Sequence, residues 1–312
     1  MCRITAFYLR NPAHEVLAKI FEAHRDASID DPKLAAISSR RSHLDGWGYA
    51  IASRRKGALS ISFSKYGWGI DTECSSRVLE ILVERLSKVD EVVGVLHSRA
   101  ASPGQPLGDV AAHPYHVTVV IGGEQRRVLE DAWSSWLGLK HLEEAMVLLT
   151  RIESYIRGEA QVVHLFVAHN GSVDREALAK ALRIKSVAMY TDSHLLALYL
   201  AKKLEEENRF DAKLLASILG EVFDSYTPSG TALNVAMLAY RPPSDVELLL
   251  CTRLKNVSDA KREYYRMVVA RLGEGIVVAS STVGDLLEKK GVRVEDLEEG
   301  VWRLYPEVEK LR

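Results

Sequence analysis

Cysteine is scarce in this 312-residue chain, which contains only Cys2, Cys74 and Cys251 and no CxxC pair. An odd number of widely spaced cysteines argues against a disulfide framework and against a zinc knuckle. Apolar runs that approach the roughly 20 residues needed to span a bilayer are absent, as are the basic and apolar regions of a signal peptide. We therefore expect a cytoplasmic protein without a membrane partner.

An excess of acidic or basic residues is also missing. The formal net charge is −1, and no long run of acidic or basic residues occurs. This balance argues against nucleic acid as a partner. Hydrophobic residues make up 47% of the chain, which is enough for a large core. The expected partners are a small-molecule substrate or another protein, and the sequence indicates no cofactor and no metal.

Hydrophobic patterning predicts an alternation of strands and helices. Amphipathic spacing predicts helices over 13–28, 72–88, 193–207 and 211–223, with Thr72 as an N-cap. Apolar or alternating runs predict strands over 3–8, 47–52, 59–64, 92–98, 117–123, 161–171, 233–240, 246–252, 264–272, 275–281 and 301–306.

These elements favour an α+β protein in which two stacked sheets lie between layers of helices. No linker or repeat divides the chain, so we expect a single domain over 1–312. A helical segment at about 120–160, with Trp133 and Trp136, interrupts the strands. It is interpreted as a helical excursion packed on the body, and the alternative is a docking surface or a cover over a site.

Five short stretches carry residues typical of functional sites: MC at the start, HLDGWGYA (43–50), HSRAASPGQP (97–106), VAHNGSVD (167–174) and YTDSHLL (190–196). Each also has an ordinary structural explanation. Asn-Gly is the usual signature of a tight turn, Thr-Asp-Ser commonly caps a helix, and a cysteine at position two is usually without function. Only their order along one chain changes this interpretation.

In that order, followed by AHPY after the second stretch, the motifs resemble the class II glutamine amidotransferases, which are N-terminal-nucleophile (Ntn) hydrolases. The resemblance covers nearly the whole chain and includes the tail, with ALNVAMLAY, Tyr264-Tyr265 and GIVVASST. It implies an αββα Ntn-hydrolase fold made of two mainly antiparallel sheets. It also implies that Met1 is removed, so that Cys2 carries both the nucleophilic thiol and the amine that acts as its base.

The resemblance further implies hydrolysis of the glutamine side-chain amide to glutamate and ammonia through a Cys2 thioester. Asn170 and Gly171 would stabilise the oxyanion, and Arg99, Ser102 and Asp192 would bind the substrate's α-carboxylate and α-ammonium groups. Residues Gly46, Trp47 and Gly48 would form a wall near the nucleophile. His43, His97 and His113 are expected to be structural hydrogen-bonding residues rather than bases.

Two positions depart from the family pattern: Ala100 replaces a bulky aromatic residue, and Pro103 has no backbone N–H to donate. The chain also resembles the stand-alone members, which supply ammonia to a synthase in trans or hydrolyse other γ-glutamyl amides. Three functions therefore stay open: glutamine amide hydrolysis, hydrolysis of a γ-glutamyl amide or peptide with another leaving group, and a non-catalytic γ-glutamyl-binding regulatory subunit. The sequence does not decide between a monomer and a homo-oligomer.

Overall fold

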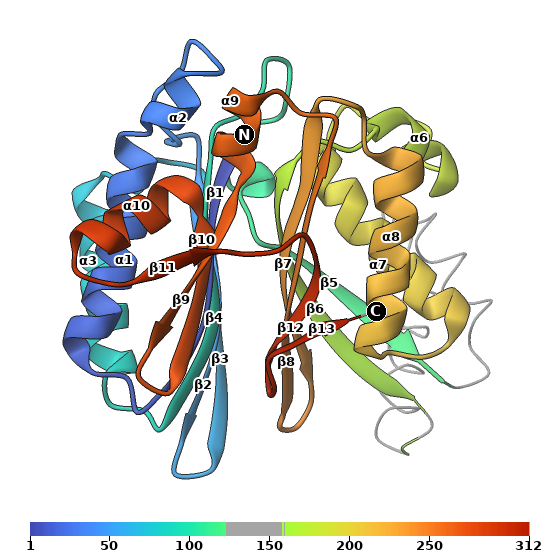
Figure 1. Cartoon of the computed structure of the whole chain (residues 1–312). Helices are drawn as coiled ribbons and strands as arrows, with labels where there is room; N and C mark the ends of the chain where they lie inside the picture. Colours follow the sequence, from blue (N-terminus) through green and yellow to red (C-terminus); the bar gives the residue numbers. More distant parts are fainter. Residues whose placement is uncertain (123–157, 159, 312) are drawn as a thin grey trace.

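Two antiparallel sheets stack face to face in the computed structural model, which describes residues 1–122, 158 and 160–311 (Figure 1). This arrangement confirms the predicted α+β class and the two stacked sheets. The predicted helical segment at about 120–160 lies almost entirely outside the described residues. Within the described part of the chain, no helix combines the length and apolar character required to cross a bilayer.

The first sheet, sheet A, has the strand order β11-β9-β10-β1-β4-β2-β3. Its strands are β1 (Cys2–Arg10), β2 (Trp47–Arg55), β3 (Ala58–Tyr66), β4 (Glu91–Arg99), β9 (Met267–Leu272), β10 (Gly275–Ser280) and β11 (Val294–Asp296). Sheet B has the order β13-β12-β8-β7-β6-β5. It consists of β5 (Tyr115–Ile121), β6 (Gln161–Gly171), β7 (Thr231–Arg241), β8 (Asp245–Lys255), β12 (Gly300–Tyr305) and β13 (Glu309–Leu311).

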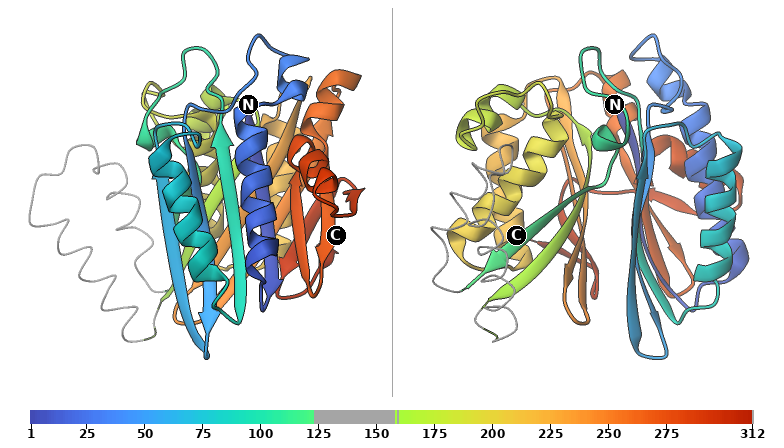
Figure 2. Two further views of the ribbon diagram at one scale, coloured as in Figure 1. Left: turned by 90° about the vertical axis from the view of Figure 1, so that its left-hand side faces the viewer. Right: turned by 180° about the vertical axis from the view of Figure 1, so that it is seen from behind.

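Helices cover the outer face of each sheet, as Figure 1 and the right-hand view of Figure 2 show. Sheet A is covered by α1 (His14–Ile29), α3 (Glu73–Leu86) and α10 (Ser281–Lys289), and sheet B by α6 (Arg175–Ala181), α7 (Asp192–Glu207) and α8 (Ala212–Tyr226). The short helices α2 (Pro32–Ala35), α9 (Asp259–Tyr265) and η1 (Asp109–Ala111) lie at the end of the sandwich that carries the N-terminus.

The pattern of β1 shows how the layers are held. Alternate side chains of a strand point to opposite faces. Ile4 and Ala6 belong to the apolar core between the sheets, whereas Phe7 and Leu9 belong to the core beneath the helices of sheet A. Because β1 is buried on both faces, apolar residues follow one another without alternation from Ala6 to Leu9, and the polar residues Arg3 and Thr5 near its start are buried as well.

Local signals place several helix starts. The side chains of Thr72, Thr191 and Asp211 accept hydrogen bonds from backbone N–H groups in the first turns of α3, α7 and α8. Such caps satisfy N–H groups that have no partner within the helix. The predicted N-cap at Thr72 is therefore confirmed.

The predicted strand over 264–272 is wrong in its first part. Tyr264 and Tyr265 end α9, and β9 begins only at Met267. The aromatic pair suggested a strand, but the preceding DAKRE segment favours a helix, and Ser258 occupies the N-cap position. Two further helices, α6 and α10, were not predicted from the sequence.

Candidate functional site

Cys2 is the first residue of β1 and faces Arg99, the last residue of β4, across sheet A. Its side chain lies on the inner face, as the alternation with Ile4 requires, and the residue is 6% exposed. The backbone N–H of Cys2 donates a hydrogen bond of 3.0 Å to Oδ1 of Asn170, which lies on β6 of sheet B. The two sheets therefore meet at this residue.

The contact with Cys2 fixes the orientation of the Asn170 amide. A backbone N–H can only donate, so the oxygen of the amide must face Cys2 and the nitrogen must point elsewhere. That nitrogen, Nδ2, is buried and has no hydrogen-bond partner. Buried donors without an acceptor are rare, and this one is available to an acceptor that a ligand would bring.

Gly171 follows Asn170 at the end of β6. A Cβ atom there would lie 1.8 Å from the carbonyl oxygen of Ala232, and the φ angle is +154°. Both the close backbone approach and the φ angle require glycine. The sequence NG therefore does not mark a hairpin turn here, because β6 continues through both residues, paired with β7.

Arg99 provides a buried cation beside the thiol. The residue is 4% exposed, and Nη1 donates a hydrogen bond of 2.9 Å to the carbonyl oxygen of Pro106. Among residues 1–122 and 160–311, no carboxylate forms an ion pair with this guanidinium group. A buried arginine without a carboxylate partner is suited to bind an anionic ligand group.

Asp192, the first residue of α7, provides an anion in the same region. Its Oδ1 accepts from the N–H of Ser193 at 2.9 Å, and its Oδ2 accepts from the N–H of Val173 at 3.4 Å. Burial raises the pKa of the Cys2 thiol, the N-terminal ammonium and Arg99 lower it, and Asp192 raises it. These opposing effects mean that a cation and an anion both lie within electrostatic range of the sulfur.

Histidines form the wall behind Cys2. The rings of His97 and His113 stack with centroids 4.0 Å apart, and Nε2 of His97 donates to the carbonyl oxygen of His169 at 3.3 Å. Nδ1 of His97 is buried without a partner. Burial lowers the pKa of both stacked rings well below the usual range, so both are neutral near pH 7.

Cys2, His97 and His113 also form the group in the described chain whose ligand atoms come close enough to hold a metal ion, within 4.8 Å of one another. Thiolate and imidazole are ligands that zinc prefers. However, the two rings stack at an interplanar angle of 28°. Stacked imidazoles cannot both direct their in-plane lone pairs at one ion, so this arrangement fits a metal poorly.

Two predicted site residues do not join the others. The indole of Trp47 lies on the outer face of sheet A, where its Nε1 donates to Oγ of Ser75 at 2.9 Å and its ring stacks on Tyr66. Ser102 is exposed, and its carbonyl oxygen accepts a hydrogen bond from the N–H of Gln105 in a turn. No hydrogen bond among the described residues directs the Ser102 hydroxyl toward Cys2. The prediction that Trp47 walls the nucleophile is wrong, because β2 is buried on both faces and its pattern hides which face a residue takes.

The two predicted glycines next to Trp47 do lie at the site. The carbonyl oxygen of Gly46 accepts from the N–H of Arg99 at 2.8 Å. Gly48 faces His97 across the sheet, and a Cβ atom there would lie 2.4 Å from the carbonyl oxygen of His113. Gly48 therefore allows the backbone before β5 to approach sheet A.

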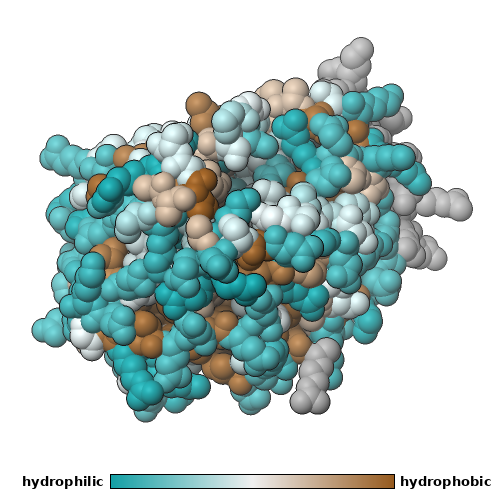
Figure 3. Space-filling model, turned by 45° about the horizontal axis from the view of Figure 1, so that its top comes forward, coloured by the Kyte–Doolittle hydropathy of each residue, from teal (hydrophilic) through white to brown (hydrophobic). Residues whose placement is uncertain are grey.

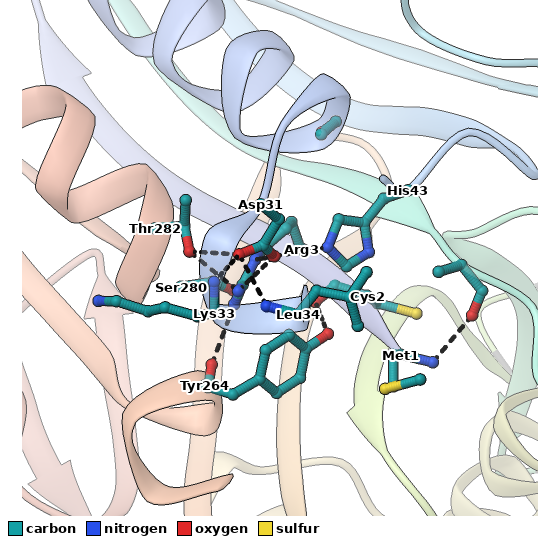
Figure 4. Close-up of polar contacts among 12 residues, drawn as sticks. Met1, Cys2, Arg3, Asp31, Lys33, Leu34, His43, Tyr264, Ser280 and Thr282 are labelled. Carbon is teal, nitrogen blue, oxygen red and sulfur yellow. Dashed lines mark hydrogen bonds and ion pairs between the residues drawn. The ribbon is translucent and has the colours of Figure 1, made fainter. Parts of the chain in front are cut away.

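Sequence reasoning missed Tyr264, whose hydroxyl group donates to the carbonyl oxygen of Cys2 at 3.2 Å (Figure 4). It also gave no role to Arg3, which is fully buried although it is charged. An arginine within the apolar run of β1 was a signal that could have identified this region, because a buried charge requires partners.

Met1, which precedes Cys2, is partly buried. Met1 packs beside Leu34, Ala100, Tyr264 and Tyr265. A surface cavity of about 710 Å³ lies elsewhere, at the start of α8 and beside β12 and β13. On the N-terminal end, hydrophobic side chains of the described residues appear as separate patches among hydrophilic ones (Figure 3).

No protein-family profile matches this chain, and no curated protein is significantly similar to it.

Proposed function

We propose that the chain is a class II glutamine amidotransferase with an Ntn-hydrolase fold, which hydrolyses the side-chain amide of glutamine through Cys2 after Met1 is removed. One observation carries the proposal: Asn170 binds the backbone nitrogen of Cys2 through Oδ1 and keeps Nδ2 buried and unpaired. This arrangement holds a nucleophile and an oxyanion donor in one geometry, with the nucleophile at the start of a central strand between two sheets.

The mechanism follows from the groups at Cys2. Burial raises the pKa of the thiol, so the nucleophile needs a base. An α-amino group has a reference pKa of roughly 7.7 to 8.0, so near neutral pH a useful fraction of the freed Cys2 amine can accept the thiol proton. The histidines are not required for this step.

The sulfur then forms a bond to the amide carbon of glutamine, and the carbonyl electrons move to the oxygen. Nδ2 of Asn170 and the backbone N–H of Gly171 would donate to this oxyanion. When the carbonyl re-forms, the carbon–nitrogen bond breaks, and ammonia leaves with the proton held by the Cys2 amine. Water then attacks the thioester, which releases glutamate and restores the thiol.

The same site supplies groups for the other end of glutamine. The guanidinium of Arg99 matches the α-carboxylate in charge and shape, and the carboxylate of Asp192 matches the α-ammonium. Both act electrostatically on the Cys2 thiol, which supports their sharing one ligand with it. Ser102 is not part of this proposal.

Removal of Met1 would also open the site. The Met1 ammonium donates to the carbonyl oxygen of Ala100 at 2.9 Å, and the Met1 carbonyl accepts from the N–H of Ala100 at 2.7 Å. Loss of Met1 would free both backbone groups of Ala100 beside Cys2. It would also vacate the space that the Met1 side chain occupies.

The test measures ammonia release from glutamine by purified protein whose N-terminus has been verified by mass spectrometry. We expect turnover by the mature chain, none by Cys2→Ala, and full turnover by Cys74→Ala, which removes an exposed thiol on α3. A lysine inserted between Met1 and Cys2 should also abolish turnover, because the nitrogen of Cys2 then stays in a peptide bond and cannot act as a base. Equal rates in Cys2→Ala and the unsubstituted chain would refute the proposal.

The same assay decides among the functions that the sequence left open. Faster turnover of γ-glutamyl dipeptides than of glutamine would indicate another leaving group. A regulatory subunit would bind glutamine without forming a thioester, so labelling of Cys2 by the glutamine analogue diazo-oxo-norleucine would argue against it. Co-purification would identify any synthase that accepts the ammonia.

A further inference from the structure

The backbone of Cys2 has no strand partner for its own hydrogen-bonding groups. Met1 and Ala100 exchange both of their backbone hydrogen bonds. In an antiparallel pair such residues alternate with pairs that exchange none, so the next pair, Cys2 and Arg99, is of the second kind. On the other edge of β1, pairing with β10 begins only at Thr5.

Two side chains take the place of the missing strand. The N–H of Cys2 donates to Oδ1 of Asn170 at 3.0 Å, and its carbonyl oxygen accepts from the hydroxyl of Tyr264 at 3.2 Å. Figure 4 shows Tyr264 reaching from its short helix to the backbone of Cys2. Both polar groups of the predicted nucleophile are therefore held from outside the sheet.

We propose that Tyr264 is a positioning residue that fixes the backbone of Cys2 relative to Asn170, and this proposal rests on the proposed function. Removal of Met1 would turn Cys2 into a chain terminus and would remove the Met1–Ala100 pair that precedes it. Terminal residues fray unless something holds them. In the mature chain the Tyr264 hydroxyl is then one of two side-chain contacts that hold Cys2 in place.

Tyr264 is itself held rigidly by Arg3. The guanidinium carbon of Arg3 lies 4.2 Å from the centre of the Tyr264 ring, and Nη1 donates to the carbonyl oxygen of Tyr264 at 3.0 Å. Arg3 is fixed in turn by Asp31, which accepts from Nε at 2.6 Å, and Nη2 donates to Oγ1 of Thr282 at 3.0 Å. All of these side chains are buried.

Asp31 has little freedom to move. Its Oδ2 accepts from Nε2 of His43 at 2.7 Å, and its Oδ1 accepts from Oγ1 of Thr282 at 2.8 Å. The backbone N–H groups of Lys33 and Leu34 also donate to Oδ1, both at 3.1 Å. A chain of fixed contacts therefore runs from Asp31 through Arg3 to the ring whose hydroxyl binds Cys2.

The test compares Tyr264→Phe with Tyr265→Phe, which removes a hydroxyl from the neighbouring buried ring. The hydroxyl of Tyr265 accepts from Oγ1 of Thr231 and makes no hydrogen bond to Cys2. For mature Tyr264→Phe we expect kcat for glutamine to fall about tenfold. KM should stay unchanged. The thermal midpoint should fall only slightly, because the carbonyl oxygen of Cys2 loses its partner while the ring and its contact with Arg3 remain. Tyr265→Phe should retain kcat.

A second measurement does not depend on glutamine. Protein labelled with carbonyl-¹³C cysteine gives one NMR signal for each of the three cysteines, and Cys74→Ala and Cys251→Ala assign the remaining one to Cys2. Tyr264→Phe should shift the Cys2 signal alone, and Tyr265→Phe should shift none.

An unmoved Cys2 signal, or unchanged turnover in Tyr264→Phe, would overturn the positioning role while wild-type turnover still supports the proposed function. If the mature chain does not hydrolyse glutamine, the proposed function fails. The positioning of the Cys2 backbone is then supported by a shifted signal and refuted by an unmoved one.

Discussion

Two buried polar clusters meet at β1, and they differ in how completely their hydrogen bonds are made. The Arg3 cluster, which consists of Arg3, Asp31, His43, Tyr264 and Thr282, leaves a single side-chain atom, Nδ1 of His43, without a partner in the described structure. The Asn170 cluster, which consists of Cys2, His97, His169 and Asn170, leaves three: Nδ1 of His97, Nε2 of His169 and Nδ2 of Asn170.

The difference separates support from function. A nearly satisfied buried network rigidifies its surroundings, whereas each buried polar group without a partner lowers stability. Buried polar groups without a partner persist where a ligand supplies the missing hydrogen bonds. The Arg3 cluster therefore holds the start of β1, and the Asn170 cluster presents unused donors and acceptors beside the thiol.

Breaking the Arg3 cluster should have the largest effect. In Arg3→Met, Asp31 remains buried without its cation, and we expect the free energy of unfolding to fall by about 3 to 5 kcal/mol in urea denaturation. Adding Asp31→Leu should not restore this loss, because it leaves the buried donors of His43 and Thr282 without their acceptor. Arg10→Met on the same strand is the control, since its ion pair with Glu274 is exposed. A stable Arg3→Met variant would show that the cluster does not support the fold.

Breaking the Asn170 cluster should affect turnover more than stability. Asn170→Ala removes the oxyanion donor, and we expect kcat for glutamine to fall by about 10² to 10³. Asn234 lies directly across the sheet from Asn170, and its Nδ2 donates to the carbonyl oxygen of Tyr265 at 2.7 Å. Asn234→Ala should reduce stability by about 1 to 3 kcal/mol and turnover far less. If both variants lose stability and turnover alike, the distinction between the clusters fails.

Acid should weaken the fold through His24, which lies behind β1 and contacts Oγ1 of Thr5 and Oγ of Ser98. Burial, and then the charges of His43 and Arg3, lower its pKa to about 3. Its unfolded pKa is about 6.5, so between these values the unfolded state binds one more proton and stability falls as the pH falls.

The size of this effect is at most about 1.4 kcal/mol per pH unit for one histidine. Urea unfolding between about pH 7 and about pH 5 measures how the free energy of unfolding changes with pH. This change should be smaller for His24→Gln than for the unsubstituted chain. Equal changes would mean that His24 takes up its proton in the folded state.

Patterns within single elements predicted much of the fold. Capping residues such as Thr72 mark helix starts because they bond to N–H groups of the same turn, and the β6 prediction matches the observed strand, Gln161–Gly171. The Tyr264-Tyr265 pair was predicted to be part of a strand because aromatic residues favour strands, but both residues end α9. Propensity over a short window could not separate a strand from a helix end.

The candidate site was predicted less evenly. Motifs predicted five site residues that the structure brings close together at the end of the sandwich that carries the N-terminus: Cys2, Arg99, Asn170, Gly171 and Asp192. Trp47 failed because a strand buried on both faces gives no alternation from which to choose a face. Tyr264 was missed because its contact with Cys2 spans 262 residues of sequence.

The amino-acid sequence by itself determined most of the segments that become strands and the longer helices, because hydrophobic period and capping act over a few neighbouring residues. It also determined the types of side chain available to the site. Only the tertiary structure decided that the Asn170 amide turns its oxygen to Cys2 and leaves its nitrogen unpaired, and that Arg3 supports Tyr264. Those outcomes depend on distances between residues remote in the chain, and such distances are set by the packing of the two sheets.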